Sequence, residues 1–454
     1  MKLRSIKLTN FRCFETLEVP LRDDLTVLVG NNGAGKTAIL DGIAYALARI
    51  LTRMPGVGGK DLRPEDIRLA GNNVAAPYAR IEAESIDGIR WTRTQKRDQT
   101  QQTGEQIPVD IGDKALFEHI DVAIHDVAEG RNSDLPVFSY YGVSRAVFEL
   151  PQRRREFRKE FSRFQALENT LEPTARFKEL FEWFYAKERD EGARFTEYIN
   201  SDPFVEWSTR YKKGEKKAPP PPRFPTTLPV LDAVRRAVSE VIPGYSKPKI
   251  RTEPLRLVLT KKLPDQTEQE FSLQMLSDGY RTMVAMVMDF ARRLAQANPH
   301  LPDPLAAKAI LIIDEVDLHL HPRWQQTVLP ALRRAFPNTQ IIATTHSPQV
   351  LSTVHSESIL ILDNNQLRTC PVPSFGARSS DLVETVLGLE DSRPPNNEIT
   401  QKIIRLFAAI DSGDLTTAKS VREELRDWQN GQPEPDMARA DFLIRQLEAR
   451  NGKK

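Results

Sequence analysis

At positions 30 to 37 a glycine-rich stretch ends in a lysine and a threonine. It follows the apolar run Leu25–Val29 and reads Gly30, Asn31, Asn32, Gly33, Ala34, Gly35, Lys36, Thr37. Glycines let consecutive backbone N–H groups converge on phosphate oxygens, and the start of a following helix adds partial positive charge. We expect Lys36 to reach the β- and γ-phosphates of a nucleotide and Thr37 to place its hydroxyl on Mg²⁺. A glycine-rich turn without a ligand fits this strand–loop–helix context less well.

Two adjacent carboxylates end a second apolar run. Ala309–Ile313 has the texture of a buried strand, and Asp314 and Glu315 follow it directly. We expect Asp314 to hold Mg²⁺ through water and Glu315 to polarise the attacking water as a general base. Alone, such a pair also occurs for structural reasons. Together with the glycine-rich loop it predicts hydrolysis of ATP, with ATP and Mg²⁺ as cofactors.

Histidines and a further aspartate follow the carboxylate pair. His346 ends the apolar run Gln340–Thr345, and we expect it to sense the γ-phosphate through a hydrogen bond, the alternative being a packing or capping role. His319 and His321 would share one side of an extended segment and could bind a metal. A turn leading into a helix explains that segment better. Asp317 is expected at a subunit boundary.

A second candidate anion site lies 240 residues downstream of the glycine-rich loop. Ser277, Asp278 and Gly279 stand at a predicted helix start, where a hydroxyl, an N–H group and the helix dipole can face an anion. A nucleotide cradled by its own loop does not need a second helix start from the same chain. Two copies facing each other would use both. The pattern therefore predicts a homodimer in which each ATP lies between one copy's loop and the other copy's Ser277.

The elements that carry these residues indicate an α/β fold. Apolar runs and amphipathic helices alternate in residues 1–149 and again in 230–373. Residues 150–229 are charged and aromatic at helical spacing and end in a lysine- and proline-rich linker, which we expect to be exposed. Residues 374–454 are expected to form a helical tail that contacts a partner or another copy.

Composition sets the remaining limits. Lys and Arg number 64 against 62 Asp and Glu in 454 residues, so the net charge of +2 says nothing for or against a nucleic acid. The two cysteines, Cys13 and Cys370, argue against a disulfide framework and a cysteine-built zinc site. With no signal-peptide core and no run of about 18 apolar residues, we expect a cytoplasmic protein without a membrane segment.

Taken together, the motifs resemble the ATP-binding-cassette heads of the SMC, RecF and Rad50 class. Residues 30–37 match the Walker A motif, 276–280 the signature, 310–315 the Walker B motif, Asp317 the D-loop and His346 the switch histidine. The opening LTNFRCFETLEV is also similar, and the resemblance implies that Arg12 lies near the triphosphate. The glutamine loop of the class has no clear counterpart; YYGVSR at residues 140–145 is the nearest candidate.

The resemblance extends to the ATPase subunit of Septu and retron-linked anti-phage systems. It rests on DEVDLHLHPRWQ, TTHSPQVLS, YYGVSR and the tail from SFGARSS to ELRDWQ. In that family the ATPase works with a separate HNH nuclease. The resemblance implies a bacterial defence ATPase that senses infection, controls a nuclease effector and assembles into a higher oligomer. Gly376 and Arg378 depart from the Tyr-Gly-Arg-Asp of the family tail, so no role is assigned to them.

Other functions stay open at this stage. About a hundred residues follow His346 without a D-x-D or H-N-H pattern, so we expect no nuclease domain in the chain itself. A repair ATPase of the RecF or Rad50 kind that acts directly on DNA is the main alternative. Its support is a basic run that has an alternative as a solvated helix face: Arg153, Arg154, Arg155, Arg158, Lys159 and Arg163. A scaffold that barely hydrolyses its nucleotide is a further alternative, whereas a transporter motor is disfavoured. Direct binding of DNA or RNA is left open.

Overall fold

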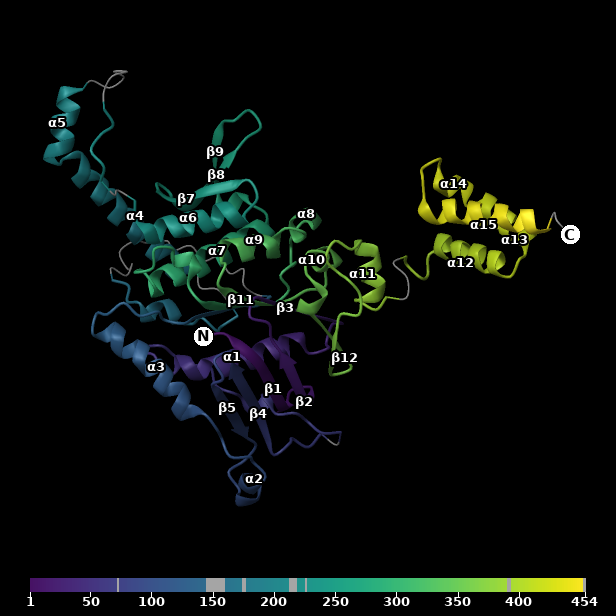
Figure 1. The fold of residues 1–454 in the computed structure, drawn as a ribbon, viewed down its shortest axis with the longest axis horizontal. Coiled ribbons are helices and arrows are strands. Elements are labelled where there is room, and N and C mark those ends of the chain that lie inside the picture. The colour runs from purple at the N-terminus through teal and green to yellow at the C-terminus, as the bar shows by residue number, and fades with distance from the viewer. Residues whose placement is uncertain are drawn as a thin grey trace. The chain divides into compact units, whose positions relative to one another are not determined.

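The computed structural model describes residues 1–71, 73–143, 160–173, 177–211, 219–224, 227–389 and 393–451. The chain divides into two compact units, Met1–Leu382 and Val383–Lys454 (Figure 1). Within the described residues, no helix combines the length and the apolar character that crossing a membrane requires.

A six-stranded sheet forms the centre of the first unit. Its strand order is β13-β12-β3-β11-β10-β6, and every pair is parallel except β12–β13. The strands are β3 (Leu25–Gly30), β6 (Val137–Tyr141), β10 (Ala309–Ile313), β11 (Thr339–Thr344), β12 (Ile359–Asp363) and β13 (Gln366–Thr369). All residues of β6, β10 and β11 are buried, which explains their continuous apolar runs. The predicted α/β architecture is confirmed.

A second sheet packs below α1 (Lys36–Leu51), the helix that follows the glycine-rich loop (Figure 1). It is antiparallel, in the order β2-β1-β4-β5. Its strands are β1 (Leu3–Phe11), β2 (Phe14–Pro20), β4 (Tyr78–Ser85) and β5 (Arg90–Lys96). The buried Trp91 indole on β5 donates to the Ala46 carbonyl of α1 at 2.9 Å, which fixes the helix on this sheet. Beyond β5 come α2 (Gln101–Glu105) and α3 (Asp113–Ala128).

Helices cover the other face of the central sheet (Figure 1). The long α7 (Asp278–Ala297) packs on β6 and is itself covered by α4 (Phe177–Ile199) and α6 (Pro229–Val241). The three-stranded sheet β7 (Tyr245–Thr252), β8 (Leu255–Lys262), β9 (Glu268–Ser272) leads into α7. Short helices complete the unit: α5 (Asp202–Arg210), α8 (Pro322–Gln325), α9 (Val328–Ala335) and α10 (Pro348–Leu351). Helix α11 (Ser379–Thr385) contains the boundary between the two units.

The proline-rich linker is exposed where the structure describes it, but it is also anchored. The Tyr198 hydroxyl donates to the Pro222 carbonyl at 2.9 Å, and the Trp207 indole donates to the Pro219 carbonyl at 2.9 Å. Tyr198 also stacks on Phe224, with ring centroids 5.6 Å apart. The aromatic residues of the insertion therefore hold this extended segment against α4 and α5.

The second unit is helical, as expected for the tail. It contains α12 (Glu398–Asp411), α13 (Leu415–Glu424), α14 (Arg426–Gln429) and α15 (Pro435–Asn451). Its helices bury a core of their own that includes Ile403, Leu406, Val421, Leu425 and Met437. Since this core is separate from that of the first unit, the tail has the anatomy of an independent domain.

Candidate nucleotide-hydrolysis site

The glycine-rich loop has the backbone that phosphate binding requires. Gly33 and Gly35 have φ angles of 80° and 105°, which glycine adopts without strain. At Gly30 a Cβ would lie 2.4 Å from the Leu362 carbonyl oxygen of β12, so no side chain fits there. The loop therefore turns tightly from β3 into α1, with the helix N-terminus facing the space where phosphates would lie.

Lys36 is folded over this loop. Its Nζ donates to the carbonyls of Gly30 at 2.8 Å and Asn31 at 3.1 Å. Burial lowers the pKa of Lys36, and nearby Asp314 and Glu315 act in the opposite direction. The ammonium group is thus held at the mouth of the loop by weak partners that a phosphate can replace.

Thr37 and Asp314 meet although 277 positions separate them. The strand order puts β10 next to β11 and β11 next to β3, so the carboxyl ends of β3 and β10 lie close together. The Thr37 hydroxyl donates to Asp314 Oδ2 at 2.8 Å, and the Thr344 hydroxyl donates to Asp314 Oδ1 at 2.6 Å. Hydroxyl and carboxylate oxygens are ligands that Mg²⁺ prefers. This pair fits the predicted Mg²⁺ site, where the cation would neutralise phosphate charge.

The backbone turns away from the direction of β10 at Glu315. Its φ is +49°, an uncommon value for a residue with a side chain. Its N–H donates to the Thr344 hydroxyl at 2.7 Å, and the Val316 N–H donates to the Thr344 carbonyl at 2.9 Å. The turn keeps Asp314 buried while Glu315 is half-buried. Its role as a general base stays a prediction.

His346 follows β11, the strand that lies between β3 and β10. Hydrogen bonds hold both residues next to it in the chain, Thr345 and Ser347. The Thr345 hydroxyl donates to Asp317 Oδ1 at 2.5 Å, and the Ser347 hydroxyl donates to Gln325 Oε1 at 2.9 Å. His346 itself is half-buried. This placement is compatible with the sensor role predicted for it. The alternative of a metal bound by His319 and His321 gains no support, because the described residues include no group of three or more potential His, Cys, Asp or Glu ligands.

Ser277 caps the N-terminus of α7 at the surface. Both Ser277 and Asp278 are exposed, whereas Gly279 is buried. A Cβ on Gly279 would lie 2.2 Å from the His319 carbonyl oxygen, so the segment after Asp317 packs directly on this helix start. Gly279 is therefore packed within the chain, whereas Ser277 and Asp278 are exposed, as contact with a second molecule requires.

Arg12 is held by two carboxylates. Its Nη1 donates to Asp41 on α1 at 2.7 Å, and its Nε donates to Asp66 at 2.8 Å. Burial alone would lower the pKa of Arg12, but Asp41 and Asp66 outweigh it and raise the pKa. Arg12 thus lies against the helix that starts at Lys36. Its predicted approach to the triphosphate stays a prediction.

Sequence reasoning missed the connection between the Walker B strand and α7. Tyr141 ends β6, and its carbonyl accepts from the Asp314 N–H at 2.8 Å. Its hydroxyl donates to Asp289 Oδ2 at 2.8 Å, and Asp289 pairs with Arg292 and Arg293 at 2.7 and 2.8 Å. Three charges at i, i+3 and i+4, directly after the apolar stretch of α7 from Met283 to Met288, were the available signal. The glutamine loop stays unplaced: of the segment YYGVSR, Tyr141 contacts Asp314, and residues 144 and 145 lie outside the described residues.

This buried cluster gives a stability prediction. Burial would raise the pKa of Asp289, but Arg293 and Arg292 hold it well below its ordinary value. Asp289→Ala leaves two buried guanidinium groups without their carboxylate, so we expect unfolding of the first unit to become easier by about 3–5 kcal/mol in urea titrations. Asp121→Ala, which removes the exposed partner of Arg53, should change the stability far less, because solvent screens an exposed ion pair. Equal effects of the two variants would contradict this ranking.

Two family models match the chain. One, described as an AAA domain, matches residues 5–201, which include the glycine-rich loop. The other, described as "AAA domain, putative AbiEii toxin, Type IV TA system", matches residues 210–352, which include Ser277, Asp314 and His346.

Similar proteins cover most of the chain. The retron Ec83 probable ATPase of Escherichia coli is 30% identical over 88% of this chain and 78% of its own length. The retron Vc95 probable ATPase of Vibrio cholerae serotype O1 biovar El Tor is 25% identical over 94% and 87%. Septu protein PtuA of Bacillus mycoides (strain KBAB4) is 32% identical over 35% and 22%. The solved SMC head domain from Thermotoga maritima aligns with 82% of this chain and 99% of that chain, with 15% identity and a TM-score of 0.41.

The fold, the loop and the matching domains define an ABC-type ATPase of the RecF, SMC and Rad50 class. Within that class the chain belongs to the family of retron ATPases, because it is 30% identical to a member and spans 78% of that member's length. The resemblance to this class and to the retron and Septu branch is confirmed. The chain is therefore a defence-associated ATPase.

Proposed function

We propose that this chain binds and hydrolyses ATP at sites shared by two copies, and that the ATP state controls a separate nuclease effector during phage infection. The observation that carries the ATPase part is the contact between Thr37 and Asp314, which joins loop and carboxylate strand in one site. The exposed N-terminus of α7, with Ser277 as its cap, supports the sharing. The control of a nuclease is inferred from similarity to retron and Septu proteins.

Each residue has a definite task in this proposal. The loop N–H groups and Lys36 bind the phosphates, and Thr37 and Asp314 hold Mg²⁺, which neutralises phosphate charge when bound. Glu315 takes the proton of the attacking water, and His346 bonds the γ-phosphate. Ser277 of the second copy closes the pocket from the other side. Loss of the γ-phosphate then removes the group that both copies contact.

Lys36→Ala tests the phosphate loop. The variant loses a charge-assisted contact worth about 1.5–3 kcal/mol, so we expect ATP to bind about 10- to 100-fold more weakly in calorimetric titrations. Lys262→Ala, at an exposed lysine at the end of β8, is the matched control and should bind ATP normally. Tight ATP binding by Lys36→Ala would refute the assigned loop.

Plaque assays test the cellular role. The chain, expressed with the genes beside its own, should lower phage plating at least about tenfold, and Lys36→Ala should abolish this protection because ATP binding is lost. A nuclease of the HNH type should co-purify with the wild-type chain. Equal plating with wild type and variant, and no nuclease in the purified complex, would overturn the defence proposal while leaving the ATPase intact.

The alternative of a repair ATPase that acts directly on DNA gains no specific support. Arg163 is engaged in the fold, since its Nε donates to the Ala297 carbonyl at 2.7 Å. The other residues of the basic run, Arg153 to Lys159, lie outside the described residues.

A further inference from the structure

A pocket of about 680 Å³ lies between the insertion helix α4, helix α6 and strand β7. Its volume is in the range of pockets that bind small ligands, roughly 300–1,000 Å³. Its lining residues come from segments other than the loop and strands that carry the ATP site. Both α4 and α6 pack on α7, the helix that begins at Ser277. A ligand in this pocket would contact both α4 and α6, the two helices that pack on α7.

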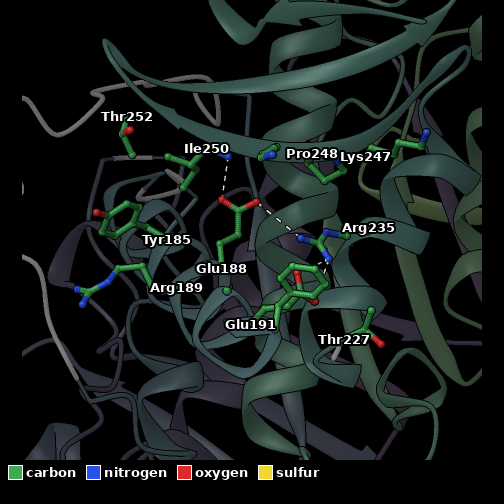
Figure 2. Close-up of a pocket in the computed structure, with 13 residues that line it drawn as sticks. Tyr185, Glu188, Arg189, Glu191, Thr227, Arg235, Lys247, Pro248, Ile250 and Thr252 are labelled. Atoms are coloured by element: carbon green, nitrogen blue, oxygen red, sulfur yellow. Dashed lines mark hydrogen bonds and ion pairs between the residues drawn. The ribbon is translucent and has the colours of Figure 1, made fainter. Parts of the chain in front are cut away.

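A carboxyl group with spare acceptor capacity lies in the middle of the pocket. Glu188 Oε2 accepts from the Ile250 N–H at 2.9 Å, and Oε1 forms an ion pair with Arg235 at 3.7 Å, a distance longer than a hydrogen bond. Arg235 also pairs with Glu191, at 2.8 Å. Figure 2 shows the Glu188 carboxyl between Ile250 and Arg235, with Tyr185 beside it. Burial raises the pKa of Glu188 to about 7, although the Ile250 N–H and Arg235 act in the opposite direction.

A glycine in the wall of the pocket has no other explanation in the fold. Gly192 lies inside the 23-residue helix α4, where glycine costs roughly 1 kcal/mol relative to alanine. A Cβ built on Gly192 would have nothing within 4 Å, so no neighbouring atom requires its absence. Gly192 lines the pocket. Its missing side chain leaves open space at the wall of the pocket.

The rest of the lining combines aromatic rings with cations. Tyr185 and Phe195 lie on the same helix as Glu188 and offer flat apolar surfaces. Arg189 and Lys249 line the pocket and are exposed. A carboxylate accepts N–H donors, an aromatic ring stacks on a flat ring, and the cations attract an anion. A nucleotide combines these three features.

We propose that this pocket binds a guanine nucleotide, with the base against Glu188 and the phosphate toward Arg189 and Lys249. Guanine has two adjacent N–H donors on one edge, which a carboxylate can accept together. Adenine has a ring-nitrogen acceptor beside its amino group, which a carboxylate repels. The site needs neither an occupied ATP site nor a nuclease partner, so its test is independent of the proposed function.

The test uses GMP and the full chain carrying Lys36→Ala, without Mg²⁺, so that the phosphate loop does not contribute. Calorimetry at pH 8 should give a Kd of about 10–100 µM for GMP, the scale expected for a ligand of this size. AMP should bind at least about tenfold more weakly, since its ring nitrogen faces the carboxylate. Glu188→Gln should remove this preference, because an amide can pair with either base.

Gly192→Leu, added to the same chain, should narrow the pocket, because Gly192 lines it and a Cβ there meets no atom within 4 Å. It should weaken GMP binding at least tenfold and leave the melting temperature unchanged or higher, because leucine favours the helix. The matched control is Ala193→Leu, at the adjacent exposed position outside the pocket, which should bind GMP normally. No heat and no thermal shift at 1 mM GMP, equal binding of GMP and AMP, or unchanged binding by Gly192→Leu would each overturn the proposal.

Discussion

Glu315→Gln should abolish ATP turnover while preserving ATP binding. The amide has the size of the carboxylate but cannot take a proton from water, and loss of a general base costs about 10²- to 10⁴-fold in rate. Asp314, Thr37 and Lys36 are untouched, so nucleotide and Mg²⁺ should still bind. Phosphate release measured at saturating ATP gives the rate. Size-exclusion chromatography with light scattering should show an ATP-dependent dimer that outlasts that of the wild type.

The matched control for this variant is Glu18→Gln, at an exposed glutamate of β2, which should hydrolyse ATP at the wild-type rate. If wild type and Glu315→Gln turn over equally slowly, the chain is a scaffold whose nucleotide fixes an assembly. If the variant fails to bind ATP, Glu315 has a structural role in the loop after β10. Its φ of +49° allows this, since such a conformation is sensitive to its surroundings.

Motifs and strand textures identified most residues of the candidate site because they act over short stretches of sequence. The loop from Gly30 to Thr37 and the pair Asp314–Glu315 each combine an apolar run with polar residues at a fixed offset. Parallel strands bring such ends to one edge of a sheet. The meeting of Thr37 with Asp314 follows from that rule once the strand order is known.

What the sequence did not reveal depends on contacts between distant segments. The hydrogen bond between Thr344 and Asp314 requires β11 to lie between β3 and β10, and the sequence does not show this strand order. Asp289 sits in an apolar helix and gave no sign that it meets Tyr141. The pocket around Glu188 joins an insertion helix to β7 across 62 positions. No local pattern encodes such pairings, because each partner satisfies the other only after folding.

Ser277→Arg should leave ATP binding within about threefold of wild type but abolish the ATP-dependent dimer and lower hydrolysis at least tenfold. The serine is an exposed helix cap that makes no side-chain capping bond of its own, so the folded chain tolerates the change. An arginine there occupies the space that the other copy's nucleotide must enter, and mismatched contacts cost several kcal/mol. Ser239→Arg, at an exposed position of α6, is the matched control. Normal turnover by Ser277→Arg would refute the shared site.

Mixing two inactive variants separates sharing from a site built within one chain. Ser277→Arg retains its phosphate loop, and Lys36→Ala retains its Ser277. A mixed dimer therefore contains one complete site if Ser277 acts on the other copy's nucleotide, and none if it acts on its own. Random pairing puts half of the chains in mixed dimers with one complete site out of two, so an equal mixture should recover up to about a quarter of the wild-type rate. A rate no higher than the mean of the two separate variants would contradict a site shared between the copies.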